Sequence, residues 1–210
     1  MNKRTPIFPL NLVVFPLSLY PLHIFEERYK RMIKRCIKTG EHFGIVSKID
    51  LEISDIGCLV YVNKILKDYE TGRKDILVQG VSRFKILKTY MHKDGYLEAE
   101  IKPFKDIGEY DVDPDHVKST LTKFENIISR TTIKLNERFW KNLSELKSKS
   151  FKLAEKSGLT IKQQQQLLSI QNESDRLKYL NDHFDKLEKS FDNAEVLRDI
   201  IAGDGFIEEE

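Results

Sequence analysis

The sequence predicts an α+β protein in which the strands come first and the helices follow. Between residues 1 and 104, short apolar stretches alternate with turn signals, and only residues 26–38 have helical spacing. After a polar connection at 103–113, apolar residues recur every three or four positions. We therefore expect a β-rich domain at 1–104, a helical bundle at 105–202 and a flexible acidic tail at 203–210.

The apolar run at residues 5–25 contains no acid, lysine or arginine, so its length suggests a signal peptide or a membrane span. Four prolines interrupt it: Pro6, Pro9, Pro16 and Pro21. Each proline removes a backbone donor and clashes with the preceding turn of a helix. No small residues form a cleavage site either. We expect two extended pieces instead, at about 6–10 and 12–15, ended by proline-rich turns.

The first helix is expected to begin at Glu26 and to end near Lys38, with Gly40 as its stop. Its buried face follows from helical spacing and comprises Phe25, Tyr29, Met32, Ile33 and Cys36. The later strands are expected at 43–47, 57–66, 75–79, from 84 onward, and at 96–101. Turns at 70–74 and at Asp94-Gly95 connect them.

The helical half has three start signals. Pro114 follows Asp113, Thr160 and Gln163 form a capping box, and Asn172 precedes a long helix. A further helical segment is expected from Phe139 to Gly158. The long helix carries a seam of Leu177, Leu180, Phe184, Leu187 and Phe191. The seam is shorter than a coiled coil requires, which favours a helix packed in a bundle over a dimer zipper.

Composition limits the classes of partner and compartment. The 35 basic residues are interleaved with 33 acidic ones, giving a net charge of +2, which is no clustered footprint for nucleic acid. Cys36 and Cys58 form no C-x-x-C pair and no disulfide framework. With no signal segment expected, the sequence favours a cytoplasmic protein, either a monomer or a weak homodimer.

Motifs for catalysis and cofactor binding do not appear in the sequence. It has no P-loop, no G-x-G-x-x-G after a strand and no G-x-S-x-G elbow. The five histidines are far apart and show no ligand spacing. We expect no enzyme activity, no catalytic residues, no cofactor and no metal. A hydrolase site assembled only by folding stays open at this point.

Two groups of residues are candidates for partner binding. Tyr20, Tyr61, Tyr69 and Tyr90 lie near strand ends or turns, where they either fill the rim of a barrel or line a peptide groove. Glu27, Arg28 and Arg31 lie on the first helix, on a face that is either merely solvated or selects partners.

Several blocks of the sequence closely resemble the Lon substrate-binding domain family. They are residues 6–16, 19–26 with Arg28 and Tyr29, 42–46, 56–57, 75–80 and 82–84, and, in the helical half, 166–168 and 176–180. Together they cover roughly residues 5 to 190. The family usually has a glycine after the Phe-Pro pair, whereas Leu17 and Ser18 follow Pro16 here. The geometry of that turn is therefore open.

The resemblance implies a PUA-like pseudo-barrel with one helix, followed by a helical bundle. It also implies a stand-alone binding module without the ATPase and protease domains of Lon. The expected ligand is unfolded or extended polypeptide, held in an apolar groove or added to a sheet edge, and the module could act as an adaptor with a protease or chaperone. By analogy, Glu27, Arg28 and Arg31, with Tyr20, Tyr61 and Tyr69, are the expected contacts. RNA binding is the alternative, because PUA-like barrels elsewhere bind RNA.

Overall fold

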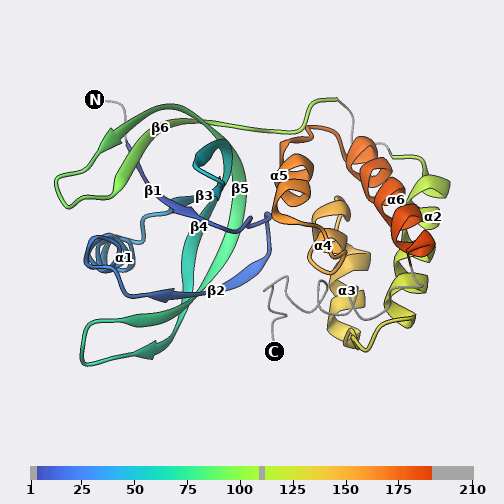
Figure 1. Cartoon of the computed structure of the whole chain (residues 1–210), viewed down its shortest axis with the longest axis horizontal. Coiled ribbons are helices and arrows are strands. Elements are labelled where there is room, and N and C mark those ends of the chain that lie inside the picture. Colours follow the sequence, from blue (N-terminus) through green and yellow to red (C-terminus); the bar gives the residue numbers. More distant parts are fainter. Residues whose placement is uncertain (1–3, 109–111, 191–210) are drawn as a thin grey trace. The chain divides into compact units, whose positions relative to one another are not determined.

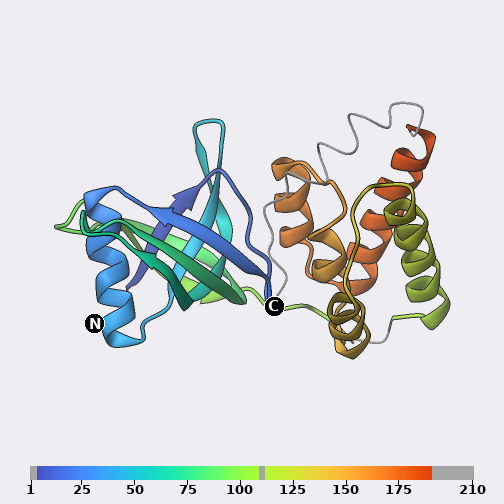
Figure 2. The same ribbon diagram turned by 90° about the horizontal axis from the view of Figure 1, so that it is seen from below.

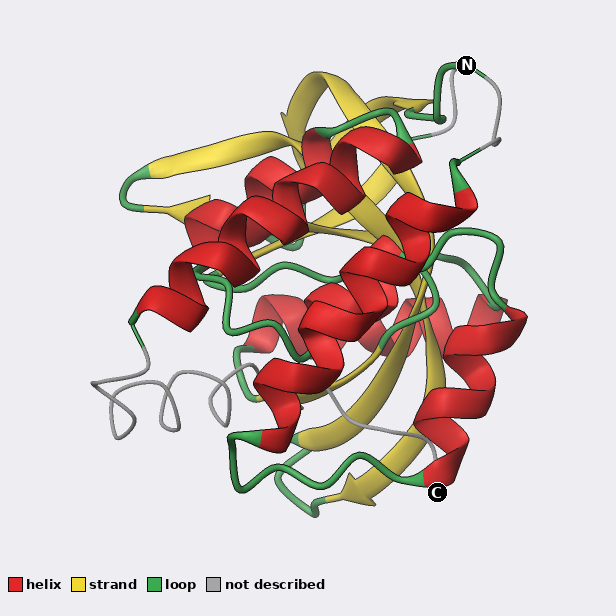
Figure 3. Ribbon diagram, turned by 90° about the vertical axis from the view of Figure 1, so that its right-hand side faces the viewer, coloured by secondary structure: helices red, strands yellow, loops and turns green. Residues whose placement is uncertain are grey.

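The computed structural model describes residues 4–108 and 112–190. These residues divide into two compact units, the first ending at Lys105 and the second beginning at Asp106. The first unit contains all the described strands and one helix, and the second contains only helices in its described part (Figures 1 and 3). The predicted α+β class, with strands before helices, is confirmed.

Six strands build the first unit. They are β1 (Thr5–Leu10), β2 (Leu19–Ile24), β3 (Phe43–Ile49), β4 (Glu52–Asp68), β5 (Lys74–Met91) and β6 (Leu97–Pro103). The order in the sheet is β2-β5-β4-β3-β1-β6, and β5 also pairs with β6. This additional pairing closes the sheet into a barrel, with β2 attached to β5 outside the closed ring. All pairs are antiparallel except β1 with β3.

The apolar run at 5–25 becomes two strands, but the second is not where the sequence placed it. The first predicted piece is β1, whereas residues 12–15 form no strand and β2 begins at Leu19. Pro21 lies inside β2, opposite Leu77 of β5. Because β2 is the end strand of the sheet, a missing N–H there breaks no second ladder, so the proline is tolerated.

β5 is also longer than expected. The sequence predicted strands at 75–79 and from 84 onward, but β5 runs without interruption through Gly80. The chain folds back over this glycine at Phe15–Ser18, where Leu17 N–H donates to the Gly80 carbonyl and Gly80 N–H donates to the Ser18 carbonyl, both at 2.9 Å. The glycine marks a close backbone approach rather than the end of a strand.

The turn that lacks the family's usual glycine carries backbone strain. Leu17 has φ of +67°, the left-handed region, and its side chain is 57% exposed. We expect Leu17→Gly to raise the free energy of unfolding by about 0.5–1 kcal/mol, since the strain released is about 1–2 kcal/mol and the added chain entropy offsets part of it. Urea unfolding measures the change. Leu66→Gly, at a similarly exposed position without positive φ, should lose stability; equal losses in both variants would contradict the explanation.

The helix of the first unit, α1 (Glu27–Thr39), packs alongside the strands of the barrel (Figures 1 and 2). Tyr29, Met32, Ile33 and Cys36 are buried, as predicted. Phe25 is not, since it lies before the helix begins and is 59% exposed, stacked on His23 with ring centroids 5.9 Å apart. Gly40 ends the helix with φ of +68° and donates its N–H to the Cys36 carbonyl, as a left-handed C-cap requires.

Five helices build the described part of the second unit: α2 (Pro114–Ser129), α3 (Glu137–Glu145), α4 (Ser150–Ala154), α5 (Ile161–Ser169) and α6 (Glu173–Lys189). The predicted caps at Asp113, Thr160 and Asn172 are present. Leu177, Leu180 and Phe184 of the predicted seam are buried within the unit, where the Phe184 ring lies 5.9 Å from that of Phe124. Phe191 and the predicted tail at 203–210 lie outside the described residues.

The segment expected from Phe139 to Gly158 is two helices rather than one. Lys149 lies between them, and its Nζ donates to the carbonyls of Leu143 and Leu146, each at 2.8 Å, which caps the end of α3. The Glu173 carboxylate accepts the backbone N–H of Lys149 and Ser150, at 2.7 and 2.9 Å. These long-range hydrogen bonds replace helical ones, and sequence spacing does not reveal them.

Candidate functional site

One edge of β4 has no neighbouring strand in the described part of the chain. β3 begins at Phe43, which lies opposite Val60, and from there it pairs with the earlier part of β4. Residues 61–68 of β4 therefore have β5 on one side only. Such an edge presents unpaired backbone donors and acceptors, with which another extended chain can pair.

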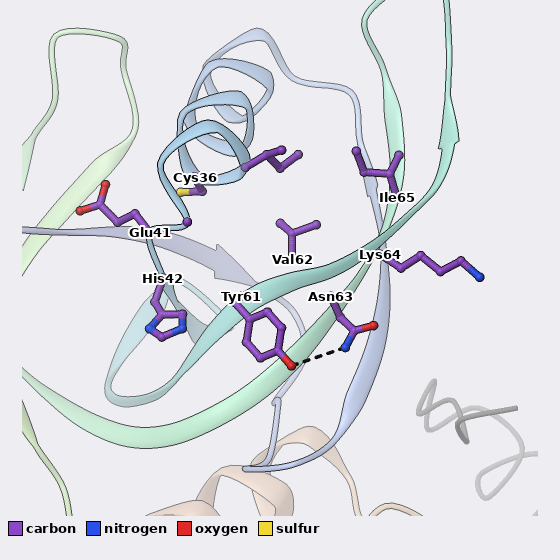
Figure 4. A pocket seen from close by; sticks show the side chains of 10 residues that line it. Cys36, Glu41, His42, Tyr61, Val62, Asn63, Lys64 and Ile65 are labelled. Carbon is purple, nitrogen blue, oxygen red and sulfur yellow. Dashed lines mark hydrogen bonds between the residues drawn. The ribbon is translucent and has the colours of Figure 1, made fainter.

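Two β-bulges shape this edge. The register of β4 against β5 shifts between Val62 and Lys64, and again between Ile65 and Lys67. Because of the first shift, Ile65 lies opposite Ile76, as Val62 lies opposite Val78. Side chains directly opposite each other in a sheet share a face, so the bulge directs Ile65 to the side of α1 together with Val62. Figure 4 shows both side chains on that side.

A pocket of about 340 Å³ lies between this edge, the end of α1 and the chain that leads into β3 (Figure 4). Its apolar lining comes from Cys36, Ile37, Val62 and Ile65. Its other lining residues are Gly40, Glu41, His42, Tyr61, Asn63 and Lys64. Ile37 and Ile65 are 38% and 42% exposed, so the apolar wall is open to a ligand.

Hydrogen bonds fix the polar side of the pocket. The Tyr61 hydroxyl donates to Gln79 Oε1, and Asn63 Nδ2 donates to the same oxygen at 3.1 Å. The His42 ring lies 5.9 Å from that of Tyr61. Gln79 belongs to β5, directly opposite Tyr61. The sheet therefore holds Tyr61 and Asn63 in place without a ligand, which lowers the entropy lost on binding.

The acidic group of the pocket already has a partner. Arg35 donates to Glu41 Oε2 from Nε at 3.2 Å and from Nη2 at 3.0 Å. Burial, and next the Glu41 charge, raise the pKa of the Cys36 thiol to about 12. At neutral pH the thiol is therefore protonated and contributes apolar surface rather than a nucleophile.

The predicted tyrosines do not form one site. Tyr61 lines the pocket, but Tyr20 is part-buried on β2 and packs against the barrel core. Tyr69 lies after the end of β4, where its hydroxyl donates to Asp75 Oδ2 at 2.7 Å. His23 Nδ1 is 2.5 Å from the other oxygen of Asp75. The hydrogen bond to His23, followed by that to Tyr69, lowers the pKa of the Asp75 carboxyl.

The predicted residues of α1 lie outside the pocket lining. Glu27 pairs with Lys30 at 2.7 Å, and Arg28 pairs with Glu26 at 2.7 Å. Arg31 is exposed on the same helix. Their role in partner binding stays a prediction.

Sequence reasoning missed most of the pocket, above all Ile37, Val62 and Ile65. Ile65 follows Lys64 in a stretch where apolar and polar residues do not alternate regularly. No period-2 pattern therefore indicates on which face of the sheet Ile65 lies. The bulge that sets its direction depends on pairing with β5, which no local signal reports.

The described residues contain no grouped metal ligands and no helix suited to a membrane. No three His, Cys, Asp or Glu side chains among them are grouped so that they could hold a metal ion. None of the described helices combines the length and apolarity needed to cross a membrane.

Comparison with known proteins identifies the family. The model of the ATP-dependent protease La (LON) substrate-binding domain matches residues 4–186. This chain belongs to that family. The Lon N-terminal domain protein of Xanthomonas campestris superposes with a TM-score of 0.66 at 23% identity, covering 85% of this chain and 96% of that one. The N-terminal domain of Mycobacterium avium complex Lon protease gives 0.64 at 16% identity, covering 87% and 98%.

Full-length relatives are much longer than this Lon-family chain. The Lon protease of Cytophaga hutchinsonii is 24% identical over an alignment 210 residues long, which covers 93% of this chain but 25% of that protein. The Lon protease of Lawsonia intracellularis is 31% identical over an alignment 106 residues long, which covers 46% of this chain and 12% of the relative. The chain thus corresponds to the substrate-binding domain and spans a quarter or less of these relatives.

Proposed function

We propose that this Lon-family domain binds extended or unfolded polypeptide at the pocket beside the free edge of β4. The observation that carries the proposal is the combination of the two features: an open apolar wall and an unpaired strand edge occupy the same place. An extended segment can insert an apolar side chain between Ile37 and Ile65 while its backbone pairs with β4.

The bulges and lysines of β4 limit the form of binding. Bulges and edge lysines are devices that prevent open-ended strand pairing and aggregation. Lys64 and Lys67 with the two register shifts therefore favour a short contact over a long added strand. Short contacts of one apolar side chain and a few backbone hydrogen bonds give weak, reversible capture, which suits a module that samples many sequences.

The test uses a labelled, permanently unfolded polypeptide, reduced and carboxymethylated α-lactalbumin, titrated with the full chain and followed by fluorescence anisotropy. We expect saturable binding, weakened about tenfold or more by Ile65→Asp, since removing one buried aliphatic contact forfeits about 1.5–3 kcal/mol. Leu66→Asp is the matched control, because Leu66 is 48% exposed on the same strand and does not line the pocket.

Two outcomes would contradict the proposal. One is the absence of saturable binding by the unaltered chain, and the other is an equal loss in both variants while circular dichroism shows both folded. A salt titration separates polypeptide capture from the RNA alternative. Apolar capture should change little between 50 and 200 mM salt, whereas phosphate contacts weaken binding steeply.

A further inference from the structure

We infer that the pocket at the free edge of β4 selects extended segments in which a carboxylate lies next to the apolar side chain that enters it. The inference rests on the proposed function and names the class of polypeptide that the site takes. Its basis is the charge that the pocket leaves without a partner.

The two formal charges in the pocket lining differ in their surroundings. Glu41 is paired with Arg35, and its side chain is 14% exposed. Lys64 is exposed and makes no ion pair with any residue in the described ranges. In Figure 4 its side chain extends from β4 away from Tyr61, at the rim of the pocket. The positive charge is thus available to a ligand, and the negative charge is already engaged.

The first unit, which contains the pocket, has a positive net charge, like Lys64. Residues 4–105 contain 18 Lys and Arg and 12 Asp and Glu, a net charge of +6. α1 contributes six of these basic residues, and Arg31, Lys34 and Lys38 follow one exposed face of it at spacings of three and four. A field of one sign around a pocket raises the on-rate of ligands with the opposite charge, and a charge at the rim selects among them.

A carboxylate next to the inserted side chain would reach this lysine without being buried. The apolar wall takes the side chain, the unpaired edge takes the backbone, and Lys64 takes the acid that follows. Because the lysine is exposed, its pair with a carboxylate adds only a little to the binding free energy. The pair therefore affects which segments are selected more than how tightly they bind. The partner is therefore an extended segment of another polypeptide with an acid next to a short apolar core.

The experiment compares three labelled peptides with the same central Ile-Val-Ile, flanked by pairs of glutamates, glutamines or lysines. With the full chain, we expect the glutamate peptide to bind roughly two- to fivefold more tightly than the glutamine peptide, and the lysine peptide to bind least. Lys64→Glu should remove or reverse this order. Lys93→Glu, which makes the same charge change in the exposed β5–β6 turn, should leave it unchanged.

The outcomes separate this inference from the proposed function. If no peptide binds, the proposed function fails. If all three bind equally, or if both variants keep the order, the acid preference is overturned while polypeptide binding stands.

Residues 206–210, Phe-Ile-Glu-Glu-Glu, have the same chemistry as the proposed ligand. If Phe206→Ser with Ile207→Ser tightens binding of the glutamate peptide severalfold, the chain's own segment occupies the pocket, and the assignment to a partner is overturned.

Discussion

Gly80→Ala is expected to lower the free energy of unfolding of the β unit by about 3 kcal/mol or more. A Cβ at this position would lie 2.0 Å from the carbonyl oxygen of Phe15 and 3.0 Å from its carbonyl carbon. Both are backbone atoms, so no side-chain rotation can relieve the overlap. The turn at Phe15–Ser18 would have to move away from β5, which breaks the two hydrogen bonds that join it to Gly80. Urea unfolding followed by circular dichroism measures the loss.

Gly40→Ala is the control for this experiment. Gly40 has a positive φ, which Gly80 does not, and nothing lies within 4 Å of the position that the Gly40 Cβ would occupy. The expected loss is therefore the left-handed strain alone, about 1–2 kcal/mol. If Gly80→Ala loses no more stability than Gly40→Ala, the clash with Phe15 is relieved at little cost, and the predicted loss of about 3 kcal/mol is wrong.

Arg176→Met is expected to destabilise the helical unit by about 3–5 kcal/mol, because it leaves buried carboxylates without their cation. The Arg176 side chain is 0% exposed and binds both oxygens of Asp106, at 2.7 and 2.6 Å, and Glu173 at 2.8 Å. Its guanidinium also lies 4.5 Å from the centre of the Phe151 ring. Burial acts to lower the pKa of Arg176, but the hydrogen bond and charge of Asp106 and Glu173 raise it overall, so the residue stays charged.

The comparison for Arg176 is a partly exposed pair in the same unit. Lys123 Nζ lies 2.5 Å from Asp185 Oδ1, with side chains 28% and 46% exposed. Lys123→Met should cost less than about 1 kcal/mol, since an exposed ion pair contributes little. Losses of similar size in the two variants, measured by urea unfolding at the same pH, would show that burial does not control the strength of the Arg176 network.

Local signals in the sequence predicted where most helices begin. Asp113 with Pro114, Thr160 with Gln163, and Asn172 all supply caps that depend on residues two or three positions away. α1 was predicted from its buried spacing and from Gly40, whose missing Cβ suits the left-handed C-cap. Such signals are reliable here because each interaction closes within one turn of the chain.

The errors concern elements that depend on distant neighbours. β2, which contains Pro21, was not predicted, since the second extended piece was expected at 12–15, yet pairing with β5 at the end of the sheet keeps residues 19–24 extended. The segment after Phe139 was expected to be one helix, but Glu173, more than twenty residues away, binds the backbone between α3 and α4. In both cases a tertiary contact overrides the local preference.

The sequence by itself determined the α+β class, the resemblance to the Lon substrate-binding domain family and the first helix, because these depend on composition, period and contiguous motifs. Of the expected binding residues, Tyr61 lines the pocket described above, which the structure and not the sequence revealed. Only the tertiary structure decided that β3 starts too late to cover the end of β4, and that a bulge against β5 directs Ile65 beside Val62. The free edge and the pocket arise from strand register, which is set between segments far apart in the chain and leaves no period within either one.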